Sequence, residues 1–243
     1  SKGIYVLLFT PKNDFIQFFN DGNDLNISVD RNNLMGSVKF KNSKANTVFY
    51  DHIKFLNDLR AEREVILKDK ENGVDETAIS KRLASLNIKY ERFFGKMVQD
   101  NPNNIAVSFL KANKEINIPF EYKTNQEKFY YYKTNYFNNM DFNAEWLHKT
   151  PFFHQKIMHY IEKLTIQNHI EVIKSVDLII EKSKNNPDLY KYLVTTFLNK
   201  YATSNQMIGQ NIYAHIAKKY YVSGDANWIE KKQLTKIVDN YNR

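Results

Sequence analysis

Three of the chain's six histidines lie between residues 135 and 164, in a stretch that also carries acidic and many aromatic side chains. Imidazole and carboxylate groups are common metal ligands, so their spacing decides whether they can meet at one ion. His154 and His159 are five positions apart, which places them about 140° apart around a helix, whereas zinc proteases use an i, i+4 pair on one face. The two imidazoles therefore diverge, and we expect solvent-facing and core-edge roles for them and no bound metal.

The run DFNAEW over residues 141–146 places oxygen-bearing side chains at alternate positions, as the start of a calcium-binding loop does. An EF-hand also needs Gly at its sixth position and Glu at its twelfth, and these positions hold Trp146 and Phe152. Calcium binding is therefore not expected. Asp141 or Asn143 is better explained as the N-cap of a short helix over residues 143–149.

The sequence carries no set of residues typical of a catalytic centre. It has no cysteine, which excludes thiol catalysis, disulfides and thiolate metal sites for this chain. It shows no Ser-His-Asp order and no Gly-rich phosphate loop, and no carboxylate pair stands out from the charged helix faces. We therefore expect no catalytic, cofactor-binding or metal-binding residues, and no enzyme activity of this chain alone.

Aromatic residues are frequent between positions 129 and 152, and several explanations compete for them. In FYYYKTNYF, residues 129–137, they fall on more than one helical face, so this helix is expected to be covered on two sides. Core packing explains the pattern, although the interleaved lysines also allow a stacking surface for single-stranded nucleic acid. A groove for a protein or peptide partner is the third alternative, and its candidate residues are Tyr131, Tyr136, Trp146 and Phe152.

The chain is basic, with a formal net charge of +8. Such a charge can indicate nucleic acid or an anionic membrane surface as a partner. However, the 29 lysines far outnumber the 6 arginines, whereas phosphate and base recognition favours the bidentate fork of Arg. We therefore do not expect nucleic acid as the partner, and keep an independent binding protein for an anionic partner as the alternative function.

The composition and the positions of turn-forming residues predict a mainly α fold, a multi-helix bundle preceded by a small antiparallel β unit. Only seven Gly and five Pro are present, and 42% of the residues are hydrophobic, which suits long helices around a substantial core. Runs rich in β-branched and aromatic residues, separated by turn-forming residues, predict three or four strands at residues 3–9, 15–19, 25–29 and 36–40. A strand that starts at Gly3 suggests that an earlier part of this β unit precedes it.

Helical spacing of apolar residues begins at Ser43, the expected N-cap of a long helix that ENGVDE at 71–76 breaks. A second long helix stops before Asn101-Pro102 and forms an antiparallel hairpin with the first. Further helices are expected at residues 103–114, 125–138, 143–149, 151–166, 168–184, 187–202, 205–221 and 231–241. We thus expect two domains, the strands at 1–41 and the helices at 42–243. The sequence shows neither a signal-peptide core nor an apolar run of about 18 residues.

Two motifs within this helical region resemble a known family. The pattern D-F…L-x-x-T-P-x-F-x-x-K at Asp141–Lys156 and the element G-D-A-N-W at Gly224–Trp228 are its most specific parts. They resemble the helical domain of unknown function in Bacteroidota cell-envelope thioredoxin-like proteins of the AhpC/TSA or TlpA type, which are thiol-disulfide oxidoreductases. The resemblance covers about residues 44–243.

In that family a small β domain comes before the helices, and a thioredoxin fold with a C-x-x-C motif normally follows them. The resemblance implies that residues 1–41 are the last strands of the β domain and that Arg243 lies near the start of the thioredoxin domain. The family's catalytic residues have no counterpart in a chain without Cys. What the resemblance implies is a non-catalytic accessory or partner-recognition module in the periplasm or outer cell envelope. Its partner would be a protein, a peptide or an adjacent thioredoxin domain.

Overall fold

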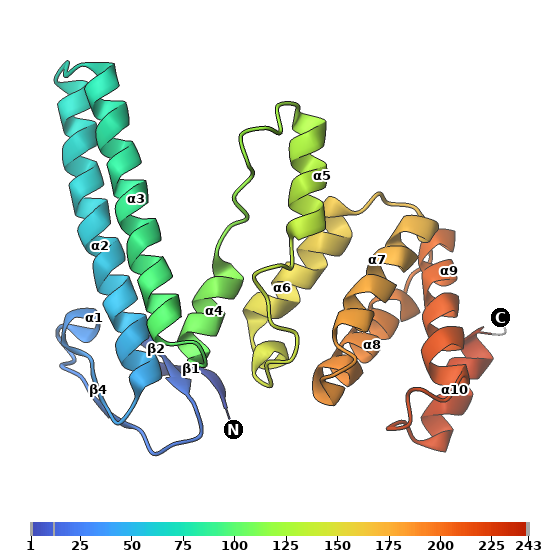
Figure 1. Cartoon of the computed structure of the whole chain (residues 1–243). Helices are drawn as coiled ribbons and strands as arrows, with labels where there is room; N and C mark the ends of the chain where they lie inside the picture. Colours follow the sequence, from blue (N-terminus) through green and yellow to red (C-terminus); the bar gives the residue numbers. More distant parts are fainter. Residues whose placement is uncertain (1, 12, 242–243) are drawn as a thin grey trace. The chain divides into compact units, whose positions relative to one another are not determined.

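The structure, a computed structural model, describes residues 2–11 and 13–241, with the exception of the Met35 side chain (Figure 1). The chain divides into two compact units, Ser1–Lys114 and Glu115–Arg243. The expected mainly α fold is confirmed, because helices make up most of both units and the described strands lie within the first 41 positions. The expected division after residue 41 falls inside the first unit, where the strands pack on the helices that follow.

The first unit begins with two short antiparallel sheets. One pairs β1 (Gly3–Phe9) with β2 (Asp14–Asn20), and the other pairs β3 (Asn26–Ser28) with β4 (Lys39–Lys41). The short helix α1 (Leu34–Ser37) lies between β3 and β4. The described strands therefore agree with the expected three or four, and they form two separate pairs.

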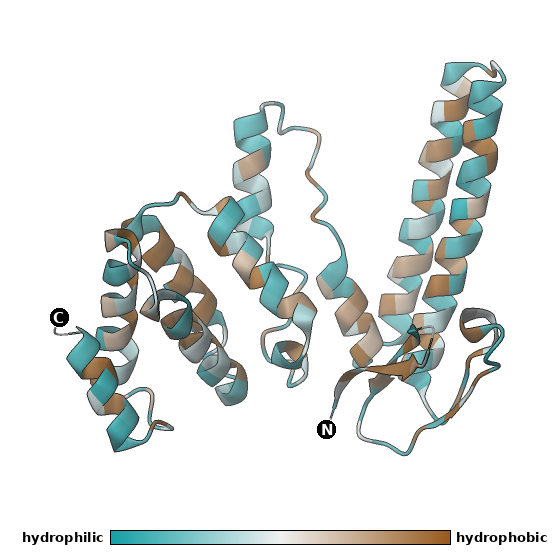
Figure 2. Cartoon of the chain, turned by 180° about the vertical axis from the view of Figure 1, so that it is seen from behind, coloured by the Kyte–Doolittle hydropathy of each residue, from teal (hydrophilic) through white to brown (hydrophobic). Residues whose placement is uncertain are grey.

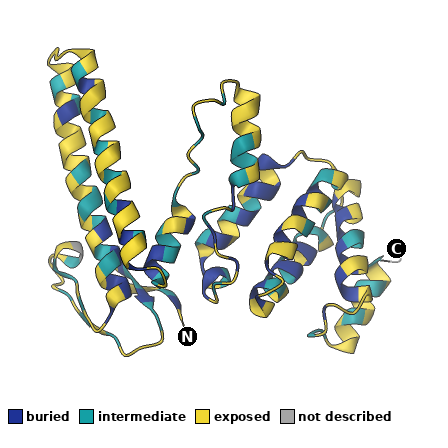
Figure 3. Cartoon of the chain, in the orientation of Figure 1, coloured by how far each residue is buried: buried dark blue, intermediate teal, exposed yellow. Residues whose placement is uncertain are grey.

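Three helices complete this unit: α2 (Lys44–Glu71), α3 (Glu76–Asp100) and α4 (Ile105–Asn113). Ser43 caps α2 as expected, because its hydroxyl accepts the backbone N–H of Asn46 at 3.3 Å. Gly73, whose φ of +86° suits glycine, ends the turn between α2 and α3. The two long helices form the expected hairpin, and their ends near this turn are largely exposed (Figure 3).

Side chains of α2 attach β2 to the helices. The fully buried Asn46 donates from Nδ2 to the Phe19 carbonyl and accepts the Phe19 N–H at Oδ1, both at 2.8 Å. The Tyr50 hydroxyl donates to the carbonyl of Gln17 at 3.0 Å. The rings of Phe19 and Phe49 meet edge to face, with centroids 4.9 Å apart. The outer edge of β2 is therefore covered by α2, both by packing and by hydrogen bonds.

The second unit is helical in its described part. Its elements, in chain order, are α5 (Asn125–Asn135), the 3₁₀ turn η1 (Leu147–Lys149), α6 (Pro151–His159), η2 (Tyr160–Leu164), α7 (His169–Lys182), α8 (Pro187–Ala202), α9 (Met207–Ile216), η3 (Ala217–Val222) and α10 (Lys231–Tyr241). Both η2 and η3 are π-helices that continue the α-helix before them. Short connections reverse the chain between α7, α8 and α9, so α7 and α9 begin at the same end of this unit (Figure 1).

The prediction of a helix at residues 143–149 is wrong, since only the 3₁₀ turn η1 forms there. Asp141 does not cap a helix: its Oδ1 accepts the N–H of Asn143 at 2.9 Å, which closes a local turn. The Nδ2 of Asn186, the N-cap of α8, donates to the carbonyl of Phe142 at 3.1 Å. These polar side chains satisfy backbone groups that a helix would have used, so the segment stays a turn.

Candidate functional site

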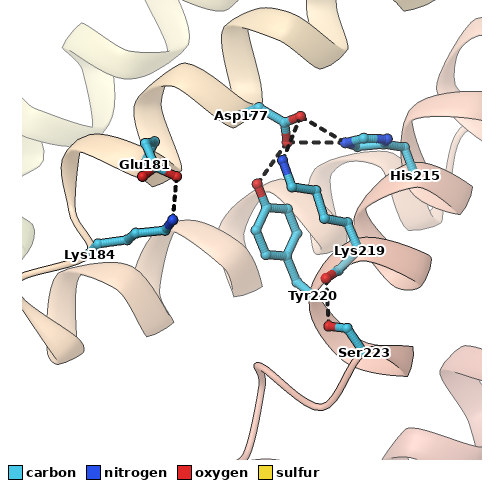
Figure 4. A network of polar contacts seen from close by, with 7 residues as sticks. All are labelled: Asp177, Glu181, Lys184, His215, Lys219, Tyr220 and Ser223. Atoms are coloured by element: carbon cyan, nitrogen blue, oxygen red, sulfur yellow. Dashed lines mark hydrogen bonds and ion pairs between the residues drawn. The ribbon is translucent and has the colours of Figure 1, made fainter.

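The described residues place three polar side chains of the second unit around one carboxylate (Figure 4). Asp177 of α7 accepts a hydrogen bond from the Tyr220 hydroxyl at 2.7 Å, and Nζ of Lys219 lies 2.9 Å from its Oδ2. Nε2 of His215 lies 3.0 Å from both carboxylate oxygens. A carboxylate can only accept, so Nε2 is the protonated nitrogen of this imidazole. We call these four residues the Asp177 cluster.

The electrostatics of the Asp177 cluster favour the charged carboxylate. The Asp177 side chain is only 25% exposed. Burial by itself would raise the pKa of this carboxyl group, but hydrogen bonds from the three donors outweigh burial, and the pKa lies below its ordinary value of 3.8. Burial and the bond to this anion raise the pKa of the Tyr220 hydroxyl. Asp177 is therefore ionised at neutral pH, and Tyr220 remains a donor.

A π-turn brings the donors of the Asp177 cluster together. His215 lies in the last turn of α9, whereas Lys219 and Tyr220 lie in η3. In an α-helix, His215 and Tyr220 would point about 140° apart, because they are five positions apart. A π-turn holds more residues, since its hydrogen bonds reach from i to i+5, and such turns occur frequently at functional sites. The wider turn places both side chains on the face that contacts α7.

The chemistry available to the Asp177 cluster is binding and alignment. All three donors are directed at one carboxylate, which joins α7 to α9 and η3. The nearby Ser223 donates from Oγ to the Lys219 carbonyl at 2.6 Å. Its hydroxyl is thus engaged with the backbone and not with the imidazole. Among the described residues, no activated nucleophile lies next to the Asp177–His215 pair.

The histidines between 135 and 164 lie apart, each in a different environment. Nδ1 of His154 and the hydroxyl of Tyr192 are 2.8 Å apart and hydrogen-bonded. The His159 ring stacks on Tyr136 with centroids 6.0 Å apart. Nδ1 of His148 is buried without a hydrogen-bond partner among the described residues, and burial lowers the pKa of this imidazole. Over residues 2–11 and 13–241, no group of three or more His, Cys, Asp or Glu side chains could hold a metal ion.

The aromatic residues considered for a partner groove occupy two environments. Tyr136 and Trp146 are buried, with 5% and 6% of their surface exposed. Tyr131 and Phe152 are half-buried. A partner at this place would have to contact the latter two, and the groove remains a prediction. Rings around Tyr136, including Tyr160 at 5.5 Å, form an aromatic core between α5, α6 and η2.

Exposed apolar side chains gather where α7 and α9 begin. Ile166 and Ile170 lie just before and within the first turn of α7, and Met207 and Ile208 begin α9. All four are exposed, Met207 by 77%. Because α7 and α9 begin at the same end of the unit, these residues belong to one end of it. We call Ile166, Ile170, Met207 and Ile208 the apolar end.

The sequence contains an indication of the Asp177 cluster that rules based on residue spacing do not detect. Asp177 interrupts the apolar run SVDLII, in which Val176, Ile179 and Ile180 are buried, and a charge within a buried stripe requires partners. The HIAKKY segment of α9 and η3 supplies them. Among the described residues, no helix combines the length and apolar character needed to cross a membrane.

One comparison with known proteins gives a match. A family model described as "Domain of unknown function (DUF5106)" matches residues 85–243. The matched region begins within α3 and includes all of the second unit. Neither a curated protein nor a solved structure matches the chain.

Proposed function

The chain belongs to this family of domains of unknown function, and we propose that it is a non-catalytic module that recognises a protein partner. The partner we propose is the thioredoxin-fold domain of an envelope thiol-disulfide oxidoreductase-like protein, in the periplasm or outer cell envelope of a Bacteroidota species. The family match supports only the helical domain of unknown function. The resemblance of Asp141–Lys156 and Gly224–Trp228 to thioredoxin-like proteins motivates the rest of the proposal.

Both motifs that carry the resemblance have structural roles in this chain. In the first, Thr150 caps α6, with its Oγ1 3.3 Å from the Phe153 N–H that it accepts. In the second, Gly224 has a φ of +90°, and the N–H of Ala226 donates to the carbonyl of Tyr220 at 2.7 Å, which ends the π-turn η3. We infer that the resemblance reflects a helical architecture shared with these proteins. It thereby supports an accessory role and not a shared reaction.

The observation that carries the proposal is the apolar end. Single exposed apolar residues scattered over a protein surface are normal, whereas several of them at one end of a unit are typical of an interaction site. The helices α7 and α9 run in the same direction, and Asp177 of α7 contacts His215 of α9. Ile170 and Ile208 each lie seven positions before these residues, so they lie at the same height along the two helices. The spacing along both helices is thus the same. The two isoleucines therefore present their side chains at one level.

The Asp177 cluster supports this role by holding the apolar end in place. It joins α7 to α9 through a charge-assisted bond from His215 and to η3 through Lys219. Preformed surfaces bind better because less conformational freedom is lost on association. The cluster is therefore assigned to alignment of the two helices.

The alternative, an anionic partner, is disfavoured by the distribution of charge. Residues 1–114 contain 18 basic and 14 acidic side chains, and residues 115–243 contain 17 and 13, so each unit carries a net charge of +4. Several lysines, among them Lys174 and Lys200, pair with glutamates. Binding to a short single-stranded DNA at two salt concentrations tests this alternative. Tight binding that weakens steeply with salt would favour it over the proposal.

The proposal is tested by titrating the chain with a thioredoxin-fold domain of the AhpC/TSA or TlpA type and measuring affinity by calorimetry. The double variant I170K/M207K places two charges in the apolar end, and we expect it to weaken binding about tenfold or more. V222K is the matched control, because Val222 is also exposed but lies in η3. Absence of binding by the unaltered chain, or equal loss in V222K, would overturn the proposal.

A further inference from the structure

Met207 is the most exposed side chain of the apolar end. It is the first residue of α9, and 77% of its surface is exposed, compared with 41% for Ile208 beside it. In Figure 2 the first turns of α7 and α9 include residues coloured as hydrophobic. Because so little of Met207 is covered, a chemical change at its thioether alters the surface of the apolar end and not the packing of the core.

Met207 is also the most exposed of the methionines whose side chains the structure describes. The chain has five methionines and no cysteine. Met97 and Met140 are buried, with 7% and 8% of their surface exposed, and Met158 is half-buried. Oxidation of sulfur-containing side chains follows their exposure to the oxidant, so we expect Met207 to react first among these four residues.

The two segments that form the apolar end contain no charged residue. Residues 164–170 and 201–217 lack Lys, Arg, Asp and Glu, although these residue types make up 26% of the chain. Charged residues are similarly depleted at the core of protein interfaces, where Met is enriched. The contact energy of this surface therefore depends on its apolar character, and a new dipole within it has a large effect.

The backbone that carries Met207 is held in place by its neighbours. Oγ of Ser204 accepts the N–H of Gln206 at 3.3 Å. Gly209 is buried, and a Cβ atom at this position would lie 2.0 Å from Oγ of Ser204, so α9 begins in close contact with the turn before it. These contacts do not involve the Met207 side chain, and modification of its sulfur atom leaves them intact.

We propose that Met207 is a site of reversible oxidation by hydroperoxides, through which the apolar end loses affinity for its partner. This inference rests on the proposed function of the apolar end. The sulfur atom bonds to the terminal oxygen of the hydroperoxide as the O–O bond breaks, and the proton on that oxygen passes to the departing alkoxide or hydroxide. The thioether is thereby oxidised by two electrons to a sulfoxide, and the hydroperoxide is reduced to an alcohol or water.

The sulfoxide changes the polarity at the most exposed point of the apolar end. It replaces a flexible apolar side chain by a polar one that accepts hydrogen bonds. A partner surface that covers Met207 would remove this acceptor from water, and burial of a polar group without a hydrogen bond weakens binding about tenfold or more. Methionine sulfoxide reductases convert the sulfoxide back to the thioether, so the loss of affinity is reversible.

Peptide mapping by mass spectrometry tests the chemical step without any partner. M35L serves as the parent protein, because the Met35 side chain lies outside the described residues. After brief treatment of the folded chain with hydrogen peroxide, the peptide with Met207 should gain one oxygen atom before the peptides with Met97, Met140 or Met158. The far-ultraviolet circular dichroism spectrum should stay unchanged. Oxidation of Met207 no faster than that of Met158, or unfolding when Met207 is oxidised, would overturn the proposed site.

Two further measurements test the effect on the apolar end. Oxidation should shorten the retention of the folded chain on a hydrophobic-interaction column. It should also lower the affinity for the thioredoxin-fold domain about tenfold or more, as measured by calorimetry. Treatment with methionine sulfoxide reductases should restore both values. M158L is the control that keeps Met207 and should remain sensitive to peroxide, whereas the retention and affinity of M207L should be the same before and after peroxide.

The outcomes separate this inference from the proposed function. Absence of binding by the unoxidised chain would overturn the proposed function and with it the regulation. Normal binding by the unoxidised chain, with unchanged retention and affinity after oxidation or an equal response of M207L, would overturn this inference alone.

Discussion

Replacing Asp177 by Asn tests whether the charge of this carboxylate stabilises the second unit. The substitution keeps the shape and one acceptor oxygen, which can still accept from Tyr220, 2.7 Å away. It removes the ion pair with Lys219, and the new amide N–H₂ group faces the donors of His215 and Lys219. A hydrogen bond to a charged group contributes about 1.5–3 kcal/mol. Because Lys219 is 46% exposed, solvent weakens its share, and we expect D177N to lower the free energy of unfolding by about 2 kcal/mol.

The effect should depend on pH in a defined direction. The pKa of Asp177 is lower in the folded state than its ordinary value of 3.8. The carboxylate therefore contributes its full stabilisation above pH 3.8, and this contribution is lost as pH falls through the folded pKa. The difference between the wild type and D177N should be constant near neutral pH and should shrink at pH values well below 3.8.

Urea unfolding followed by tryptophan fluorescence measures this change in the relevant unit, because Trp146 and Trp228 both lie in residues 115–243. Trp228 also contacts Tyr190, with ring centroids 5.9 Å apart. E181Q is the control: Glu181 lies on α7 and pairs with Lys184, but both side chains are more than half exposed, so no measurable change is expected. Equal stability of D177N and the wild type at neutral pH, or a difference that persists in acid, would refute the reasoning.

Two further predictions concern the first unit. His52 is buried between the rings of α3, its Nε2 has no partner among the described residues, and burial lowers its pKa below 6.5. The wild type should therefore lose stability as pH falls below 6.5, and H52L should not, as urea unfolding followed by circular dichroism at pH 7.5 and 5.5 would show. N46A removes both side-chain bonds to the Phe19 backbone and should cost about 2–4 kcal/mol, with faster amide exchange in β2. Unchanged exchange there would mean that Asn46 does not attach the strand.

Helix ends were predictable where a local signal determines them. Ser43 caps α2 as predicted. Thr150 likewise caps α6, and Pro151 and Pro187 occupy the first turns of their helices. Caps and prolines act on backbone groups within a few positions, so a single sequence contains the information. The prediction of a helix at 143–149 was wrong because the residue that binds the carbonyl of Phe142, Asn186, lies far along the chain.

The Asp177 cluster could not be predicted from spacing, for a physical reason. The histidine pair His154 and His159 and the pair His215 and Tyr220 have the same separation of five positions. Helical periodicity predicts divergence for both. Only the π-turn η3, whose hydrogen bonds reach from i to i+5, makes the second pair converge. The one local hint was the charge of Asp177 within an apolar stripe.

Hydrogen–deuterium exchange of the chain, with and without a saturating thioredoxin-fold domain of the AhpC/TSA or TlpA type, tests the proposed partner recognition most directly. A partner bound at the apolar end would slow exchange at residues 166–170 and at the start of α9, because it excludes water from their backbone. Peptides from α2 and α3 provide the internal control. We predict slower exchange at the apolar end alone; unchanged exchange throughout, or protection confined to residues 1–114, would contradict the account.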